Sequence, residues 1–380
     1  MNFEFNEKQL DVINKARDLA ENYLKPEVIE RDETSTFPLE GFKKLGELGL
    51  IGLPYSSEYG GSDAGYMEYV LAVEEIAKVD ASLAISYSVA TSLYGGPINN
   101  FGTEEQKKKY LPPVLSGKSL GAFNLTEPNA GSDAAGVITK AVRKGDHYVL
   151  NGLKCFSTNA PLADYFFVVA STDPELKTKG LSGFIVEKTY PGISIGRIEN
   201  KMGIRAAQVS EVIFKDVEVP AENLILGEGK GFKLAMNALD GGRMGVAAQG
   251  IGIAEGAFEI ARKYLMTREQ FGKPLYKNQY LAFKMAELDI KIEQARYLLY
   301  KAACDKDNGK SYSASAAKAK YACTNVAMEV TTEAVQMLGG NGYMKDYHVE
   351  RMMRDAKITQ IYEGTNEIQK LVVSGGLFQA

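Results

Sequence analysis

The chain has 380 residues, of which 45% are hydrophobic and 24% are charged, and its formal net charge at pH 7 is −4. This length predicts two or three domains, and the composition is ordinary for a globular protein. An acidic balance argues against nucleic-acid binding, which usually needs an excess of Lys and Arg. We therefore expect no nucleic-acid partner.

The few cysteines and histidines limit the metal and nucleophile chemistry. Three Cys are scattered without a CxxC spacing, and His147 and His348 lie far apart. This pattern fits neither a zinc site nor a His-based triad, so we predict no metal, and free thiols in a reducing compartment. The opening residues lack the basic and apolar regions of a secretory signal, and no apolar run approaches the about 20 residues that cross a bilayer. We expect a cytoplasmic protein without a membrane span.

Residues 1–120 show helical patterns and predict an N-terminal helical domain. Apolar residues between Leu10 and Tyr23 fall at helical spacing, and Asn6 with Gln9 three positions later forms a capping-box pattern. Pro112 and the proline after it end the last of these helices. The remaining helical patterns lie around 38–50, 67–79 and 103–110.

Residues 121–228 change to short segments rich in β-formers. Tyr148–Leu150 and Leu153–Thr158 flank Asn151-Gly152, which predicts a hairpin with an Asn-Gly turn. We expect a compact β-barrel or sandwich as the central domain. The further predicted strands cover 166–170, 182–187 and 210–219.

Residues 229–380 return to long helical patterns, over 232–307 and 312–338, which need antiparallel neighbours and predict a helical bundle. The glycine-rich stretch 227–231 matches neither a phosphate-binding P-loop nor a GxGxxG dinucleotide motif. We interpret it as the loop that opens the next helix. A nicotinamide cofactor then has no visible site, so a redox enzyme on this sequence would need another electron carrier.

Two distant segments carry the functional signal. One is Leu125-Thr126-Glu127-Pro128-Asn129-Ala130-Gly131-Ser132-Asp133, and the other is Gln360-Ile361-Tyr362-Glu363-Gly364-Thr365-Asn366-Glu367. Glu363 stands between an aromatic ring and a glycine, where partial desolvation would raise its pKa and make it a usable general base. The alternative for a Glu is a solvated surface carboxylate.

Together, these segments resemble the acyl-CoA dehydrogenase family, within it the short-chain, butyryl-CoA dehydrogenase-like members, and the resemblance runs from end to end. It implies an α+β multidomain fold with a C-terminal four-helix bundle. It also implies FAD-dependent α,β-dehydrogenation of a short-chain acyl-CoA to the trans-2-enoyl-CoA. In this reaction Glu363 removes the α-proton, a hydride passes to flavin N5, and an electron-transferring flavoprotein takes the electrons.

The resemblance also implies a homotetramer, a dimer of dimers, with FAD at a subunit interface. Phe156 would cover the flavin ring and Thr158 would bond N5, whereas the residues alone suggest a core aromatic and a strand residue. Arg268 suits a pyrophosphate because its guanidinium can bond two oxygens at once. The residues that the resemblance assigns to FAD are Phe123, Leu125, Thr126, Ser132, Phe156, Thr158, Arg268, Gln270, Phe271, Asn278, Gln279, Gln336, Gly339, Gly340, Thr365, Asn366 and Glu367.

The segment Asp240-Gly241-Gly242-Arg243 lies inside a predicted helix, where each glycine costs about 1 kcal/mol relative to Ala, so something must need the space. The resemblance assigns substrate contacts to Asp240, Arg243, Ser132 and Gly364, and a surface ion pair between Asp240 and Arg243 is the alternative. Relatives of the isovaleryl-CoA type carry their catalytic Glu immediately before this Arg. Here that position is Gly242, which leaves Glu363 as the matching base.

Other functions on the same scaffold remain open. They are an enoyl-CoA reductase running the reverse direction in a bifurcating complex, an acyl-CoA oxidase, and a non-enzymatic assembly protein. Asn124 departs from the family pattern close to the expected flavin and acyl pocket, and Ser157 departs from it between Phe156 and Thr158. These two departures leave a branched, cyclic or polar acyl group open as the substrate.

Overall fold

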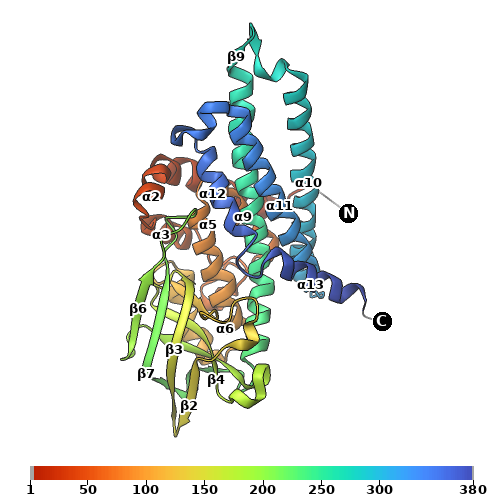
Figure 1. Cartoon of the computed structure of the whole chain (residues 1–380). Helices are drawn as coiled ribbons and strands as arrows, with labels where there is room; N and C mark the ends of the chain where they lie inside the picture. The colour runs from red at the N-terminus through yellow and green to blue at the C-terminus, as the bar shows by residue number, and fades with distance from the viewer. Residues whose placement is uncertain (1–3, 379–380) are drawn as a thin grey trace.

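The computed structural model describes residues 4–378 and shows a β-sheet region between two helical regions (Figure 1). The expected order of helical, β and helical regions is confirmed. The first three residues, part of the opening stretch in which we expected no secretory signal, lie outside the described part. Between residues 4 and 378, no helix combines the length and apolar character needed to traverse a bilayer.

The N-terminal region begins with the predicted capping box. The backbone N–H of Gln9 donates to Asn6 Oδ1 at 2.9 Å, and the Asn6 N–H donates to Gln9 Oε1 at 3.1 Å. Later helices of this region are almost wholly buried, and a buried π-helical segment, Val89–Gly95, follows one of them. The helices are α1 (Glu7–Asp18), α2 (Val28–Thr34), α3 (Leu39–Glu47), α4 (Tyr66–Ala77), α5 (Ala81–Ser88), α6 (Gly96–Phe101), α7 (Glu104–Tyr110) and α8 (Pro112–Leu115).

The central strands form one mixed sheet and not the closed barrel that was one of our two expectations. Its path runs β6-β7-β3-β2-β4-β5-β8, and β1 pairs parallel with β4 beside this path. The strands are β1 (Gly121–Asn124), β2 (Lys140–Lys144), β3 (His147–Thr158), β4 (Tyr165–Ser171), β5 (Leu181–Glu187), β6 (Ile193–Ile198), β7 (Val209–Pro220) and β8 (Leu224–Ile225).

The predicted Asn-Gly hairpin is wrong, because β3 continues through both residues. Asn151 lies where the pairing of β3 with β7 shifts in register. Its side-chain N–H donates to the Asp216 carboxylate at 3.0 Å, and its side-chain oxygen accepts from the Asp216 backbone N–H at 2.8 Å. A Cβ at Gly152 would lie 2.3 Å from Thr139 Oγ1, so this glycine permits a close approach. The chain reverses instead near Gly145, at φ +64°, between β2 and β3.

The C-terminal region contains α9 (Gly231–Thr267), α10 (Gln279–Asp307), α11 (Ser313–Leu338), α12 (Val349–Thr359) and α13 (Asn366–Leu377). The predicted helical stretch 232–307 is interrupted by a small hairpin, β9 (Glu269–Gln270) with β10 (Lys273–Pro274), at the far tip of the bundle (Figure 1). The glycine-rich loop does lead into α9, as interpreted from the sequence. The long helix α9 packs on α4 and α11, and its lower half continues alongside the sheet region (Figure 1).

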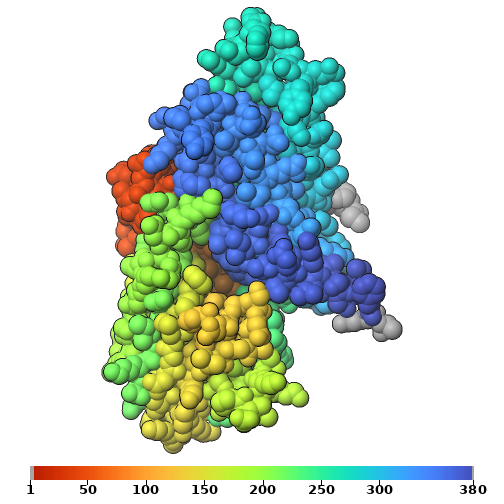
Figure 2. Space-filling model, viewed as in Figure 1, coloured from red at the N-terminus to blue at the C-terminus, as the bar shows by residue number. Residues whose placement is uncertain are grey.

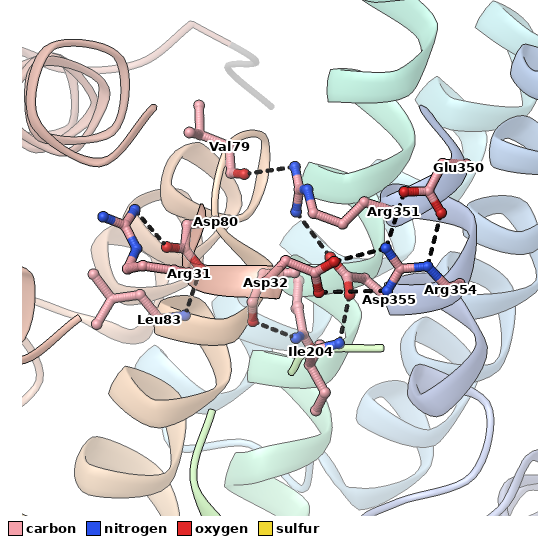
Figure 3. A network of polar contacts seen from close by, with 12 residues as sticks. Arg31, Asp32, Val79, Asp80, Leu83, Ile204, Glu350, Arg351, Arg354 and Asp355 are labelled. Atoms are coloured by element: carbon pink, nitrogen blue, oxygen red, sulfur yellow. Dashed lines mark hydrogen bonds and ion pairs between the residues drawn. The ribbon is translucent and has the colours of Figure 1, made fainter. Parts of the chain in front are cut away.

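A network of ion pairs joins all three regions (Figure 3). Arg354 of α12 bonds Asp32 of α2 at 2.7 Å and Glu350 at 2.8 Å. The next residue, Asp355, accepts the backbone N–H of Ile204 from the loop between β6 and β7, and burial raises the pKa of Asp355 to about 6. This network therefore fixes the Ile204 loop against the helix that leads to Glu363.

Candidate active site

A cavity of about 680 Å³ lies where the three regions meet, and Figure 2 shows it as a hollow bordered by yellow, green and dark blue segments. The helical region contributes Ile85, Val89 and Leu93, which are spaced one helical turn apart. Segments around β1 and β3 form a second wall, and α9 with the turn at 361–365 forms a third. A cavity of this size with mostly apolar walls and a few polar groups is the usual form of a small-molecule site.

Glu363 projects its carboxylate into a buried position beside this cavity. The residue as a whole is half-buried, but both carboxylate oxygens are inaccessible to water and have no hydrogen-bond partner. Burial raises the pKa of Glu363 to about 8, while the charges of Lys320 and Arg243 act in the opposite direction. An unpartnered buried carboxylate is rare in folded proteins and marks a functional site.

Gly242 leaves the space that the Glu363 carboxylate occupies. A Cβ added at Gly242 would lie 1.9 Å from Glu363 Oε2 and 2.7 Å from Leu93 Cδ2. At Gly241, by contrast, an added Cβ would meet its nearest atom, Lys306 Nζ, at 3.5 Å, an ordinary contact. The expectation that these glycines serve close packing therefore holds for Gly242 and not for Gly241.

Arg243 and Asp240 form an ion pair, but not on the surface. Arg243 Nη1 lies 2.5 Å from Asp240 Oδ1, the arginine side chain is only 6% exposed, and Ser313 also donates to Asp240 at 2.9 Å. Arg243 lines the cavity and its buried Nε has no partner, whereas Asp240 does not line the cavity. The arginine thus supplies a positive charge to the cavity wall, and Asp240 orients it.

Many residues predicted for FAD and substrate are brought together around this cavity. Phe156 is 64% exposed at φ +54°, so the interpretation of it as a core aromatic is wrong. An open aromatic ring held by a left-handed backbone, with the hydroxyls of Thr126 and Thr158 nearby, suits a planar ring system such as a flavin. The predicted residues that line the cavity are Phe123, Leu125, Thr126, Ser132, Phe156, Thr158, Arg243, Glu363, Gly364 and Thr365.

Other predicted residues lie away from the cavity. Asn366 is buried and bonds α11, and Glu367 is exposed on the first turn of α13. A further group is exposed around the tip that carries β9 and at the end of α11 (Figure 1). Within one chain these residues do not line the cavity. They are Arg268, Gln270, Phe271, Asn278, Gln279, Gln336, Gly339 and Gly340.

The two residues that depart from the family pattern do not line the cavity either. Asn124 and Ser157 are 0% and 1% exposed, and they alternate along β1 and β3 with the cavity-lining Phe123 and Phe156. Because successive side chains on a strand point to opposite faces, Asn124 and Ser157 point to the buried face of the sheet, away from the cavity. Neither side chain therefore lines the cavity, although Asn124 lies between Phe123 and Leu125, which do.

Two parts of the site escaped the sequence analysis. The cavity wall of Ile85, Val89 and Leu93 has an apolar spacing that repeats every fourth residue, a signal that could have found it. Lys320 is fully buried on α11 next to the Glu363 turn. In the sequence, the only feature that set this lysine apart from others was its place in an alanine-rich helix. Among residues 4–378 no group of three or more potential metal ligands occurs.

The fold and the site together are those of an enzyme with a mostly apolar cavity between a sheet and a helical bundle, and with a buried carboxylate beside that cavity. Three family models cover nearly the whole chain: the acyl-CoA dehydrogenase N-terminal domain matches residues 6–118, the middle domain 122–217 and the C-terminal domain 229–378. The chain belongs to the acyl-CoA dehydrogenase family, whose members are flavin-dependent oxidoreductases.

Individual relatives agree with this assignment. The short-chain specific acyl-CoA dehydrogenase of Clostridium acetobutylicum is 54% identical over 100% of both chains. The CarC subunit of the caffeyl-CoA reductase–Etf complex of Acetobacterium woodii is 44% identical over 99% of both. Among solved structures, butyryl-CoA dehydrogenase of Megasphaera elsdenii has a TM-score of 0.98 at 50% identity, covering both chains fully. A chain from a study of the electron transferring flavoprotein of Acidaminococcus fermentans has a TM-score of 0.99 at 51% identity, again with full coverage.

Proposed function

We propose that this protein binds FAD and dehydrogenates a short-chain acyl-CoA to the trans-2-enoyl-CoA, with Glu363 as the base. The observation that carries the proposal is the Glu363 carboxylate, which is buried and unpartnered beside the cavity. A base acts best when its pKa lies near the working pH, and burial raises the pKa of Glu363 to about 8. The carboxylate accepts no hydrogen bond that would lower its affinity for a proton.

The proton transfer is local to Glu363. Its carboxylate removes a proton from the carbon next to the thioester carbonyl, which leaves negative charge on the thioester oxygen. The turn takes the backbone of Glu363 out of the helical pattern, at φ +54°, and within residues 4–378 its N–H has no hydrogen-bond partner. We assign this N–H to the thioester oxygen, because a donor held in place there stabilises the developing charge by several kcal/mol, on the order of 3. A bound flavin supplies the acceptor for the β-hydride.

The flavin site needs more than one chain in this proposal. Phe156, Thr126 and Thr158 would hold the ring from the cavity side, and Arg268 with the other residues at the tip would hold the pyrophosphate and adenosine of a neighbour's cofactor. The exposure of this tip supports a homotetramer arranged as a dimer of dimers. Phe271 is 98% exposed and Tyr280 69%, and such apolar side chains mark contact surfaces.

The acyl-CoA dehydrogenase direction, with an electron-transferring flavoprotein as acceptor, is the function we favour. The relative named as a caffeyl-CoA reductase–Etf complex subunit supports the reverse direction, enoyl-CoA reduction, as the second candidate. The dehydrogenase and reductase directions are distinguished by measuring the anaerobic reduction of an enoyl-CoA with and without the partner flavoprotein. An oxidase would be revealed by fast reaction of the reduced enzyme with oxygen in stopped flow.

The test of the base uses Glu363→Gln in the flavin-loaded protein. We expect the yellow colour and acyl-CoA binding to persist, while anaerobic bleaching of the flavin by butyryl-CoA is lost. Glu47→Gln, at an exposed position on α3, is the control and should bleach like the unmodified protein. Bleaching at a near-normal rate in Glu363→Gln would remove this residue from the role of base. Separately, a panel of acyl-CoA thioesters, compared by flavin bleaching of the unmodified protein, would define the acyl group.

A further inference from the structure

Lys320 is a fully buried lysine beside the Glu363 turn, and the mechanism above does not use it. It is 0% exposed on α11, where its Nζ donates to the carbonyl of Gly364 at 2.8 Å and to Asn366 Oδ1 at 3.1 Å. Lysine is almost never fully buried without a partner, because its ammonium loses hydration. Here the partners are groups of the turn that carries Glu363.

The turn needs such support because its backbone is strained. Glu363 has φ +54° and Gly364 has φ +91°, and a side chain in the left-handed region costs about 1–2 kcal/mol. The Gly364 carbonyl accepts a second hydrogen bond, from Gln369 Nε2 at 2.7 Å. The Asn366 N–H closes the turn on the Gln360 carbonyl at 2.9 Å. Lys320 and Gln369 therefore hold the residue after Glu363 from two sides.

Electrostatics links the same lysine to the carboxylate. The pKa of Lys320 is lowered to about 7, mainly by burial and also by the charge of Arg243 on α9, while the charges of Glu363 and Glu367 act in the opposite direction. In turn, the positive charge of Lys320 lowers the pKa of Glu363 against the effect of burial. Below about pH 7, where the lysine is charged, removing it should thus make Glu363 harder to ionise.

We propose that Lys320 is a positioning residue for Glu363, whose hydrogen bonds to Gly364 and Asn366 hold the carboxylate at the reacting carbon. This inference rests on the proposed function, because it assigns a role through Glu363. Lys320 does not line the cavity, so its action is exerted through the turn and through its charge.

The experiment compares two variants in the flavin-loaded protein. Lys320→Met removes both the hydrogen bonds and the charge, whereas Lys320→Gln keeps a donor for the Gly364 carbonyl and removes only the charge. Lys318→Met, at an exposed position two residues earlier on α11, is the control. The readout is the rate of flavin bleaching by butyryl-CoA at limiting concentration, from about pH 6 to about pH 10.

We expect the rising limb of the pH profile to move by less than about half a pH unit in both variants, because a lysine with a pKa near 7 carries little charge where Glu363 ionises near pH 8. At high pH, Lys320→Met should remain at least about 10-fold slow because the turn is loosened, and Lys320→Gln should come closer to the unmodified rate. Flavin content and butyryl-CoA binding should stay unchanged, and Lys318→Met should match the unmodified protein throughout.

A high-pH rate in Lys320→Met equal to that of the unmodified protein overturns the proposal, as does a loss of activity that only parallels a loss of flavin or of folded protein in both variants. A failure of Lys320→Met to fold leaves Lys320→Gln as the deciding variant. The proposed function fails in a different way: the unmodified protein would not bleach with any acyl-CoA, or Glu363→Gln would remain active.

Discussion

Substituting Gly242 by Ala tests whether the Glu363 carboxylate occupies the position that the structure gives it. The added Cβ would lie 1.9 Å from Glu363 Oε2, whereas an ordinary contact begins at 3.4 Å, so the carboxylate must retreat by about 1.5 Å (3.4 − 1.9). The end of a glutamate side chain can make this movement. The backbone of α9 need not move.

The substitution should separate activity from stability. A displacement of about 1 Å can slow an enzyme about 100-fold, which corresponds to about 2.7 kcal/mol of barrier. Alanine gains about 1 kcal/mol of helix propensity over glycine, while crowding of Leu93, whose Cδ2 would be 2.7 Å away, costs about 1–3 kcal/mol. We therefore expect the free energy of unfolding to fall by no more than about 2 kcal/mol.

The assay measures anaerobic flavin reduction by butyryl-CoA together with urea unfolding. Gly241→Ala is the matched control, because its Cβ would meet only ordinary contacts. It should be neutral or stabilising by up to about 1 kcal/mol, with unchanged flavin reduction. Normal flavin reduction in Gly242→Ala, or equal losses in both variants, would refute the placement of the carboxylate.

Two further predictions concern buried charges and stability. Lys154→Met should lower the free energy of unfolding by about 3–5 kcal/mol, because it leaves the buried Glu127 carboxylate without its cation. In the folded protein Lys154 Nζ lies 2.7 Å from this carboxylate. A change below about 1 kcal/mol in urea unfolding would contradict this prediction. Glu363 ionises near pH 4.5 when unfolded but near pH 8 when folded, so folding loses stability as pH rises through this window. Glu363→Gln should therefore raise the melting temperature of the flavin-free protein at pH 8 and not at pH 4, and equal shifts at both would speak against the raised pKa.

Local features were predictable from sequence because they depend on near neighbours. The capping box at Asn6 and the strand at 182–187 follow from residues within a few positions of one another. The Asn151-Gly152 hairpin failed for the complementary reason. Asn-Gly commonly makes a turn, but here Asp216 from β7 satisfies the asparagine and Thr139 needs the space beside the glycine.

The active site shows the same division. The resemblance pointed to Glu363, Arg243 and the two flavin segments, and the tertiary structure places all of these at one cavity. It does not place the Arg268 group there, because that group lies at the opposite tip of the bundle. Asn124 does not line the cavity although Phe123 does, because neighbouring side chains on a strand point to opposite faces.

The sequence by itself determined the order of helical and β regions, the starts of several helices and the carboxylate to be examined. Only the tertiary structure decided that this carboxylate is buried without a partner, that Gly242 makes room for it and that Lys320 holds its turn. The physical reason is that desolvation and close packing arise between segments far apart in the chain, α9, α11 and the turn before α13. No local pattern records how near such segments come in the folded protein.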